Sequence, residues 1–235
     1  ELSIIDYALM SQLAYSDSTY FAEHFAEWFP IASNSTDGWS LVGQNADDDA
    51  VTFLEFFHTG RNVSVIAVRG TSTGADAAAD AVMLIDAALV QLCPLIYVLP
   101  DIVIRKIVTA LNVPGWLLFP DTDSLYFSPL LEYTERVQAD HEVVMTGHSL
   151  GAAMATLAAF ELADKGYRVA TQYTFGQPRV GNAAFANLFQ STLGASGQFR
   201  VTHYHDPVPH VPLEDMGFYH TTTEVWYNEA NTQYK

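Results

Sequence analysis

Hydrophobic positions near the amino terminus repeat with the spacing of one face of an α-helix. The repeat consists of Leu2, Ile5, Ala8, Leu9, Leu13 and Ala14. Side chains three and four residues apart lie on the same side of a helix. A polar turn around Asp37 and Gly38 follows. We therefore predict an amphipathic helix at the start of the chain.

Short runs of strand type alternate with helix-type segments along the rest of the chain. The strand-type runs are residues 51–57, 63–68, 141–145, 169–175, 199–204 and 224–227, and helix-type segments end near residue 139 and cover 151–160 and 183–189. Residues 59–62 join the first two runs and are typical of a hairpin turn. Strands that alternate with helices pair in parallel. The pattern thus predicts an α/β fold, a mostly parallel sheet with helices on both faces.

Length and composition favour a single domain over residues 1–235. A chain of 235 residues lies within the size that one hydrophobic core can serve, about 250 residues. No linker, repeat or low-complexity stretch divides it. Cys93 is the only cysteine, so no disulfide forms within the chain, and its apolar surroundings indicate a packing role.

The charge of the chain excludes two classes of partner. Its 27 acidic and 10 basic residues give a formal net charge of −17, which disfavours nucleic acid and anionic membrane surfaces. The sequence begins at Glu1 and carries N-x-S/T sequons at Asn34 and Asn62. Both features are compatible with a removed leader and with secretion. We expect an extracellular protein.

The strongest chemical signal is the stretch MTGHSLGAAM at residues 145–154. It places Ser149 between a strand-type run and a helix-type segment, so the serine lies on the turn itself. Such a turn is strained and leaves no room for side chains two positions away, where Gly147 and Gly151 stand. The pattern is that of a nucleophile elbow, and Ser149 is the predicted nucleophile.

A serine nucleophile requires further groups. A histidine takes its proton, and an acid orients that histidine. Asp206 directly follows a strand-type run, which places it at a sheet edge, although an aspartate before a proline also occurs in ordinary turns. The oxyanion requires backbone N–H groups. We expect these from Leu150, which follows the nucleophile, and from Thr71, which follows the strand exit at Gly70.

Four motifs together resemble one family. VMTGHSLGAAMATLAA, AVRGTSTGADAAAD, YTFGQPRVGNAAFA and FRVTHYHDPVPHVP are similar to the class 3 (fungal-type) triacylglycerol lipases, which also include feruloyl esterases. The resemblance covers roughly residues 51–227. It implies an α/β-hydrolase fold, Ser149 as nucleophile, Asp206 as triad acid, and Thr71 with Leu150 as oxyanion hole.

The sequence departs from the family pattern in two places. Ala77 stands between Asp76 and Asp80, where the family carries tryptophan. The Asp-His motif that holds the family's catalytic histidine does not occur before Lys235. We therefore expect a base beyond Lys235 or a differently completed triad, with His220 as the alternative within the chain.

The histidines around Asp206 also allow a metal interpretation. The group comprises His203, His205, Asp206, His210 and His220. No pair with the H-x-x-x-H spacing lies on a predicted helix. We therefore expect no metal and no organic cofactor.

Residues 76–118 form a predicted lid insertion. Within it, residues 82–100 approach the length and hydropathy of a membrane span, but Pro94 and Pro100 interrupt the run, and a span here would split the sheet. The position matches the family's lid, so we predict helices that cover Ser149. Part of this long segment could instead serve as a core element or a partner surface.

The resulting expectation is a secreted lipase that acts on acylglycerols at a lipid–water interface. An esterase of phospholipase or feruloyl type is a close alternative, although the apolar insertion favours long acyl chains. A non-catalytic member that binds lipid or a partner is the alternative from another class, supported by the missing Asp-His motif.

Overall fold

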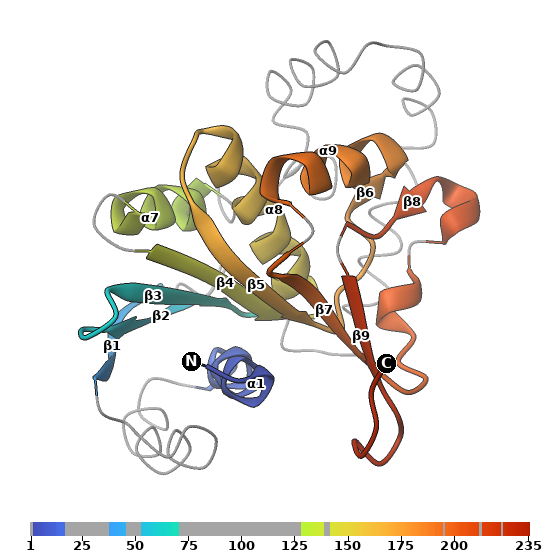
Figure 1. Cartoon of the computed structure of the whole chain (residues 1–235), viewed down its shortest axis with the longest axis horizontal. Helices are drawn as coiled ribbons and strands as arrows, with labels where there is room; N and C mark the ends of the chain where they lie inside the picture. The colour runs from blue at the N-terminus through green and yellow to red at the C-terminus, as the bar shows by residue number, and fades with distance from the viewer. Residues whose placement is uncertain are drawn as a thin grey trace.

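A seven-stranded sheet runs through the molecule (Figure 1). The computed structural model describes residues 2–16, 38–45, 53–70, 128–138, 142–194, 196–211, 213–221 and 223–235. In spatial order the strands are β1 (Trp39–Asn45), β2 (Phe53–His58), β3 (Val63–Val68), β4 (Glu142–His148), β5 (Val169–Phe175), β7 (Gln198–His203) and β9 (Thr223–Tyr227). A second, two-stranded sheet pairs β6 (Gly181–Asn182) with β8 (Phe218–Tyr219).

The sheet is mostly parallel. Strands β1, β2 and β3 form an antiparallel meander at one edge, and the pairs from β3 through β4, β5 and β7 to β9 are all parallel. The carboxyl ends of the parallel strands therefore lie at one edge of the sheet, where reacting groups gather in folds of this kind.

Helices lie on both faces of this sheet, as predicted. Figure 1 shows α7 (Ser128–Gln138), α8 (Leu150–Asp164) and α9 (Ala183–Leu193) on one face and α1 (Ile4–Leu13) on the other. Two short 3₁₀ turns, η2 (Val208–His210) and η3 (Glu214–Met216), follow β7.

The core is divided by the alternation of side chains along the strands. On β3, Ile66 and Val68 belong to the hydrophobic cluster beneath α8. Val65 and Ala67 belong to the cluster beneath α1. Successive strand side chains point to opposite faces, so both faces of the sheet are apolar and both require a helical cover.

Helix α8 is buried along most of its length, because it lies between the sheet and its neighbouring helices. All of its residues from Gly151 to Leu162 are buried. Its alanines are strong helix formers with small side chains, which lets the helix approach the sheet closely. The segment that begins at the elbow is therefore held rigidly from both sides.

Helix α1 begins with a capping box. The Ser3 backbone N–H donates to Asp6 Oδ2 at 2.7 Å, and the Asp6 N–H donates to Ser3 Oγ at 3.4 Å. This arrangement satisfies backbone donors that a helix start leaves unpaired. It fixes the position at which the first helix starts against the sheet.

The sequence pattern predicts the longer elements well, with one omission. The first helix, the hairpin of β2 and β3, and the later alternation of strands and helices are confirmed. Strand β1 was not predicted. In the described residues no helix is long and apolar enough to cross a membrane. The predicted lid at residues 76–118, Cys93 and Asn34 lie outside the described residues.

Candidate active site

Ser149 stands at the junction of β4 and α8, in a backbone conformation rare for residues with a side chain. Its φ is 56° and its ψ is −125°. Such a conformation costs on the order of 1–3 kcal/mol and persists only where the surroundings enforce it. Here the Ser149 N–H donates to the Phe175 carbonyl at 2.9 Å, and the Ser149 carbonyl accepts from Ala152 N–H at 3.0 Å. The first turn of α8 and the neighbouring strand β5 thus hold the serine in place.

The two glycines that flank the serine are required by close packing. A Cβ atom on Gly147 would lie 2.6 Å from the Gly151 carbonyl oxygen. A Cβ atom on Gly151 would lie 2.1 Å from the Val68 carbonyl oxygen. Both contacts are with backbone, which cannot swing aside. The strand–turn–helix geometry predicted for this stretch is therefore present.

Of the two predicted oxyanion donors, the structure describes Leu150. Leu150 is the first residue of α8, and the first N–H groups of a helix have no partner within it. Thr71 lies outside the described residues, but the preceding Gly70 runs against the elbow. A Cβ atom on Gly70 would lie 2.8 Å from the His148 carbonyl oxygen and 3.3 Å from the Leu150 nitrogen. The exit of β3 at Gly70 thus packs against the exit of β4 at His148 and against the start of α8 at Leu150.

Asp206 lies at the same edge of the sheet, on the turn that follows β7. Its Oδ1 accepts from the Val208 N–H at 2.9 Å. Its Oδ2 lies 3.0 Å from the position that a Cβ atom of Gly176 would occupy, and Nε2 of His148 lies 3.6 Å from that position. Gly176 has a φ of +56° and directly follows β5. One carboxylate oxygen is therefore fixed by the turn, and the other lies beside the exit of β5 at Gly176, on the side where the His148 ring also lies.

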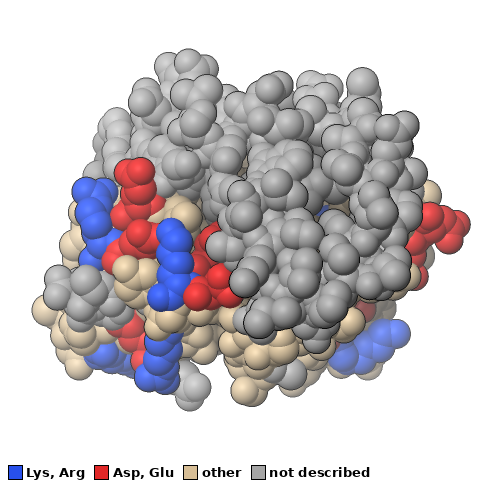
Figure 2. All heavy atoms as spheres, turned by 90° about the horizontal axis from the view of Figure 1, so that it is seen from above, with Lys and Arg blue, Asp and Glu red and all other residues tan. Residues whose placement is uncertain are grey.

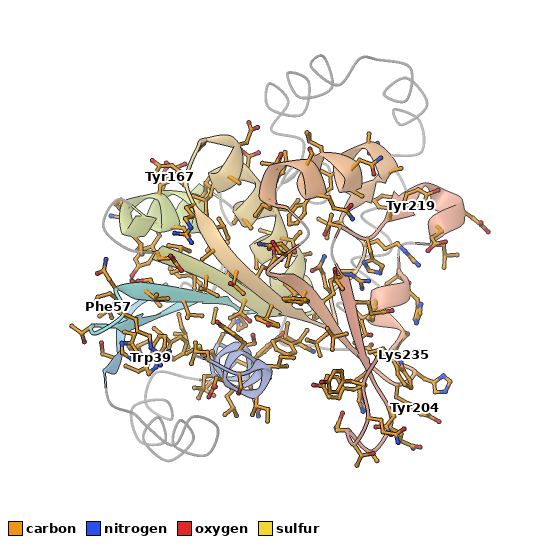
Figure 3. All side chains as sticks on the ribbon, viewed as in Figure 1. Trp39, Phe57, Tyr167, Tyr204, Tyr219 and Lys235 are labelled. Carbon is orange, nitrogen blue, oxygen red and sulfur yellow. The ribbon has the colours of Figure 1, made fainter. Side chains whose placement is uncertain are left out.

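The turn that carries Asp206 is supported by β9. Tyr204 has a φ of 46° and lies beside β9, near Lys235 in Figure 3. Its N–H donates to the Tyr227 carbonyl at 2.8 Å. Its own carbonyl accepts from Trp226 Nε1 at 3.0 Å. These two bonds fix the chain two residues before the carboxylate.

His148 and Tyr15 form a contact that sequence analysis missed. The Tyr15 hydroxyl lies 2.9 Å from His148 Nδ1. Although much of His148 is exposed, its ring packs beside Tyr15 and Gly176. This partial burial lowers the pKa of His148, while the charge of Asp206 partly offsets the effect. The pair joins the end of the first helix to the elbow. Neither the sequence around Tyr15 nor the sequence around His148 predicts this contact.

His220 occupies a different environment from the elbow. Its Nε2 is 2.7 Å from the Pro209 carbonyl oxygen, and its Nδ1 is buried without a hydrogen-bond partner. Burial, reinforced by the positive charge of Arg200, lowers the pKa of His220 to about 3. Within the described residues, no hydrogen bond joins a histidine ring to the Ser149 hydroxyl or to the Asp206 carboxylate; His203 contacts Asp206 only through its backbone carbonyl, which accepts from the Asp206 N–H at 2.9 Å. The described contacts of His220 are those of a packing residue.

A buried polar cluster supports the strand exit at Gly176. Gln177 Oε1 accepts from the hydroxyls of Thr156 at 3.0 Å and Thr174 at 2.6 Å. Thr156 lies on α8 and Thr174 on β5, and all three side chains are fully buried. This cluster links the elbow helix to the loop beside Asp206. Within the described residues no group of three His, Cys, Asp or Glu side chains could hold a metal ion.

Comparison with known proteins adds a family match. A family model described as Lipase (class 3) matches residues 65–216, a stretch that contains Thr71, Ser149, Leu150 and Asp206. Secreted mono- and diacylglycerol lipase A of Penicillium cyclopium is 48% identical over 92 residues, which are 39% of this chain and 29% of that protein. Secreted mono- and diacylglycerol lipase 1 of Fusarium solani is 49% identical over 83 residues, 35% of this chain and 24% of that protein.

Solved structures extend the likeness over nearly the whole chain. The crystal structure of a mutant form of MDLA from Penicillium cyclopium matches with a TM-score of 0.63 and 26% sequence identity. The match covers 95% of this chain and 78% of that chain. The matches to the two curated relatives, by contrast, span less than a third of those proteins.

Proposed function

Since the chain belongs to the class 3 lipase family, we propose that it is a carboxylic ester hydrolase that acts on acylglycerols through Ser149. The observation that carries the proposal is the strained serine at the β4–α8 turn, with a φ of 56° and the Asp206 carboxylate at the same sheet edge. Strain of this kind concentrates at reactive residues.

The proposed reaction has two steps. Ser149 Oγ attacks the ester carbonyl carbon while a base takes the hydroxyl proton, and the carbonyl oxygen becomes a negatively charged oxyanion. The backbone N–H groups of Leu150 and Thr71 stabilise that charge. The carbon–oxygen bond to the alcohol then breaks, and the alcohol leaves with the proton. Water attacks the acyl-enzyme by the same route and releases the fatty acid.

Asp206 is proposed to orient the base and to stabilise its protonated form. The arrangement of its carboxylate supports this role, because Oδ1 is occupied by the Val208 N–H while Oδ2 lies beside Gly176 at the exit of β5. A histidine that accepts the serine proton on one nitrogen and donates to Oδ2 from the other would complete the triad. We do not assign this role to His220, whose Nε2 is engaged by Pro209.

The substrate and location are proposed from the relatives. The two curated relatives are named as secreted mono- and diacylglycerol lipases, and we propose an extracellular enzyme that meets acylglycerols at a lipid–water interface. The exposed Asn62 at the β2–β3 turn, within a sequon, agrees with secretion. Figure 2 shows acidic and basic side chains interspersed on the described part of one face. That pattern supports neither a nucleic-acid surface nor one for anionic lipid.

Hydrolysis of nitrophenyl esters by the full-length protein tests the proposal. We expect Ser149→Ala to remove turnover, and Asp206→Asn to lower kcat by about 10⁴-fold, the size of effect known for a triad acid. Ser191→Ala, on α9 away from the elbow, is the matched control and should retain parental activity. A longer acyl chain should be preferred to a feruloyl ester.

A non-catalytic lipid-binding protein is the second candidate. It is favoured by one observation, that no described histidine ring is hydrogen-bonded to the Ser149 hydroxyl or the Asp206 carboxylate. Such a protein would bind acylglycerol yet leave nitrophenyl esters intact. Turnover that survives Ser149→Ala, or no turnover at all in the parent, would contradict the proposed hydrolase.

A further inference from the structure

The hydroxyl of Tyr15 connects two backbone segments at the candidate active site. Tyr15 follows the last turn of α1. Its oxygen accepts from the Gly70 N–H at 3.1 Å and lies 2.9 Å from His148 Nδ1 and 3.3 Å from the His148 carbonyl oxygen. Gly70 continues from β3, and His148 is the last residue of β4. A single hydroxyl thus contacts both strand exits that lead to the proposed oxyanion donors.

The position of each proton follows from the chemistry of the groups. A phenol has one proton to donate and can accept through its oxygen. Burial raises the pKa of Tyr15, so the hydroxyl keeps its proton. The phenol oxygen accepts from the Gly70 N–H. Its own proton can go to His148 Nδ1 at 2.9 Å or to the His148 carbonyl oxygen at 3.3 Å, and the shorter distance favours Nδ1. The neutral ring then carries its own proton on Nε2, the nitrogen that lies beside Gly176 together with Asp206 Oδ2.

The contact between Tyr15 and Gly70 leaves little room for movement. A Cβ atom on Gly70 would lie 2.4 Å from the Tyr15 hydroxyl oxygen. The hydrogen bond that the Gly70 N–H donates to this oxygen fixes the exit of β3 at that point. On the other strand, the residues that follow His148 are Ser149 and Leu150. The hydroxyl therefore sets the spacing between the exit of β3 at Gly70 and the elbow that carries Ser149 and Leu150.

The hydroxyl is not needed to dock α1 on the sheet. Tyr7, Met10 and Leu13 of this helix are buried against β2, β3 and β4. Ser11 Oγ also lies 2.9 Å from Thr146 Oγ1 on β4. Apolar burial and a second hydrogen bond hold the helix in place, which leaves the Tyr15 hydroxyl available for another task.

We propose that Tyr15 is a positioning residue for the elbow: through its bonds to Gly70 and His148 it holds the exit of β3 at a fixed distance from Ser149 and from the Leu150 N–H that is proposed to stabilise the oxyanion. The proposal rests on the proposed function, because it assumes that Ser149 forms an acyl-enzyme. It assigns to the first helix a part in the reaction, in addition to covering the sheet.

Tyr15→Phe in the full-length protein tests this role, because it removes only the hydroxyl. Reactive serines are counted by titration with a nitrophenyl alkylphosphonate, and rates for a soluble short-chain nitrophenyl ester are expressed per titrated serine. We expect kcat to fall about 10- to 100-fold, less than for loss of an entire oxyanion donor. KM should change less than about threefold, because the interaction is made in the transition state. The unfolding temperature should fall by no more than about 2–4 °C.

Tyr7→Phe is the matched control. It makes the same change within α1, the helix that Tyr15 follows, and keeps the ring that stacks on Tyr173 at a centroid distance of 4.8 Å. Its kcat per titrated serine should equal that of the parent. Parental kcat in Tyr15→Phe, even with a lower unfolding temperature or fewer titrated serines, would overturn the positioning role. A parent whose Ser149 does not react with the phosphonate would overturn the proposed function itself.

Discussion

At the scale of single residues, the site depends on conformations and protonation states that the fold imposes. Ser149 keeps its positive φ because its N–H and carbonyl are both engaged, by Phe175 and by the first turn of α8. His148 and His220 both have lowered pKa values, chiefly because burial disfavours the charged ring. Each neutral imidazole serves as a fixed hydrogen-bonding group. Protonation of either ring at low pH should lower the stability of the folded protein.

His220 should make the protein sensitive to acid. Its folded pKa of about 3 lies below the unfolded value of about 6.5, so the unfolded state binds an extra proton between these values. Stability is therefore complete above pH 6.5 and falls as the pH drops toward 3. We expect His220→Gln, which keeps a donor for Pro209, to lower the slope of unfolding free energy against pH by up to about 1.4 kcal/mol per pH unit between pH 6 and 4.

Urea unfolding at a series of pH values measures this slope. His205→Gln is the control, because His205 is exposed on the turn before Asp206. Its slope should match that of the parent. An unchanged slope in His220→Gln would show that the pKa of the ring in the folded protein is not lower than in the unfolded protein.

At the scale of elements, close packing of α8 on β3 is what creates the elbow. The helix begins within van der Waals reach of the β3 backbone at Val68, and only a glycine at position 151 permits this approach. The short side chains along α8 extend the same close contact over the sheet. Replacement of this glycine therefore tests the architecture of the site, independently of its chemistry.

We expect Gly151→Ala to destabilise the protein by more than about 2 kcal/mol, because the new methyl group would lie 2.1 Å from the Val68 carbonyl oxygen. Gly166→Ala is a control of the opposite kind. Gly166 has a φ of +88° and nothing within 4 Å of the new Cβ atom, so only backbone strain of about 1 kcal/mol opposes it. Free energies of unfolding measured in urea show which of the two substitutions is the more destabilising. Equal losses in the two variants would contradict the close approach of α8 to β3.

The elements that sequence predicts are those specified by local pattern. The elbow is visible because its glycines lie two residues from the serine, and β3 is visible as a run of β-branched residues. Strand β1 is not visible, since its pairing with β2 and the fit of Gly43 beneath the Tyr133 hydroxyl depend on distant residues. Tyr15 was missed for the same reason, because its partner His148 is 133 positions away in the chain.

At the scale of the whole molecule, charge governs which surfaces the protein can approach. Its formal net charge of −17 repels anionic surfaces over a distance of about 10 Å at 0.1 M salt. An enzyme proposed to work at a lipid–water interface must therefore reach it by apolar contact. Neutral acylglycerol, the proposed substrate, presents a surface without this barrier.

Binding to lipid should accordingly depend on the charge of the lipid. We expect the full-length protein to adsorb at least about tenfold more weakly to vesicles that contain phosphatidylserine than to neutral phosphatidylcholine vesicles at low salt. The difference should shrink at 0.5 M salt, because screening removes the repulsion. Vesicle sedimentation provides the measurement. Preferential binding to the anionic vesicles would point to a basic surface and contradict this account.

The central claim is that Ser149 is a catalytic nucleophile, and covalent labelling tests it most directly. The full-length protein is incubated with a nitrophenyl alkylphosphonate, digested, and the modified peptide is identified by mass spectrometry. The account predicts one equivalent of phosphonate on Ser149, release of one equivalent of nitrophenol, and parallel loss of ester hydrolysis. Hydrolysis that continues while Ser149 is fully labelled, or a label carried by another serine, would contradict it.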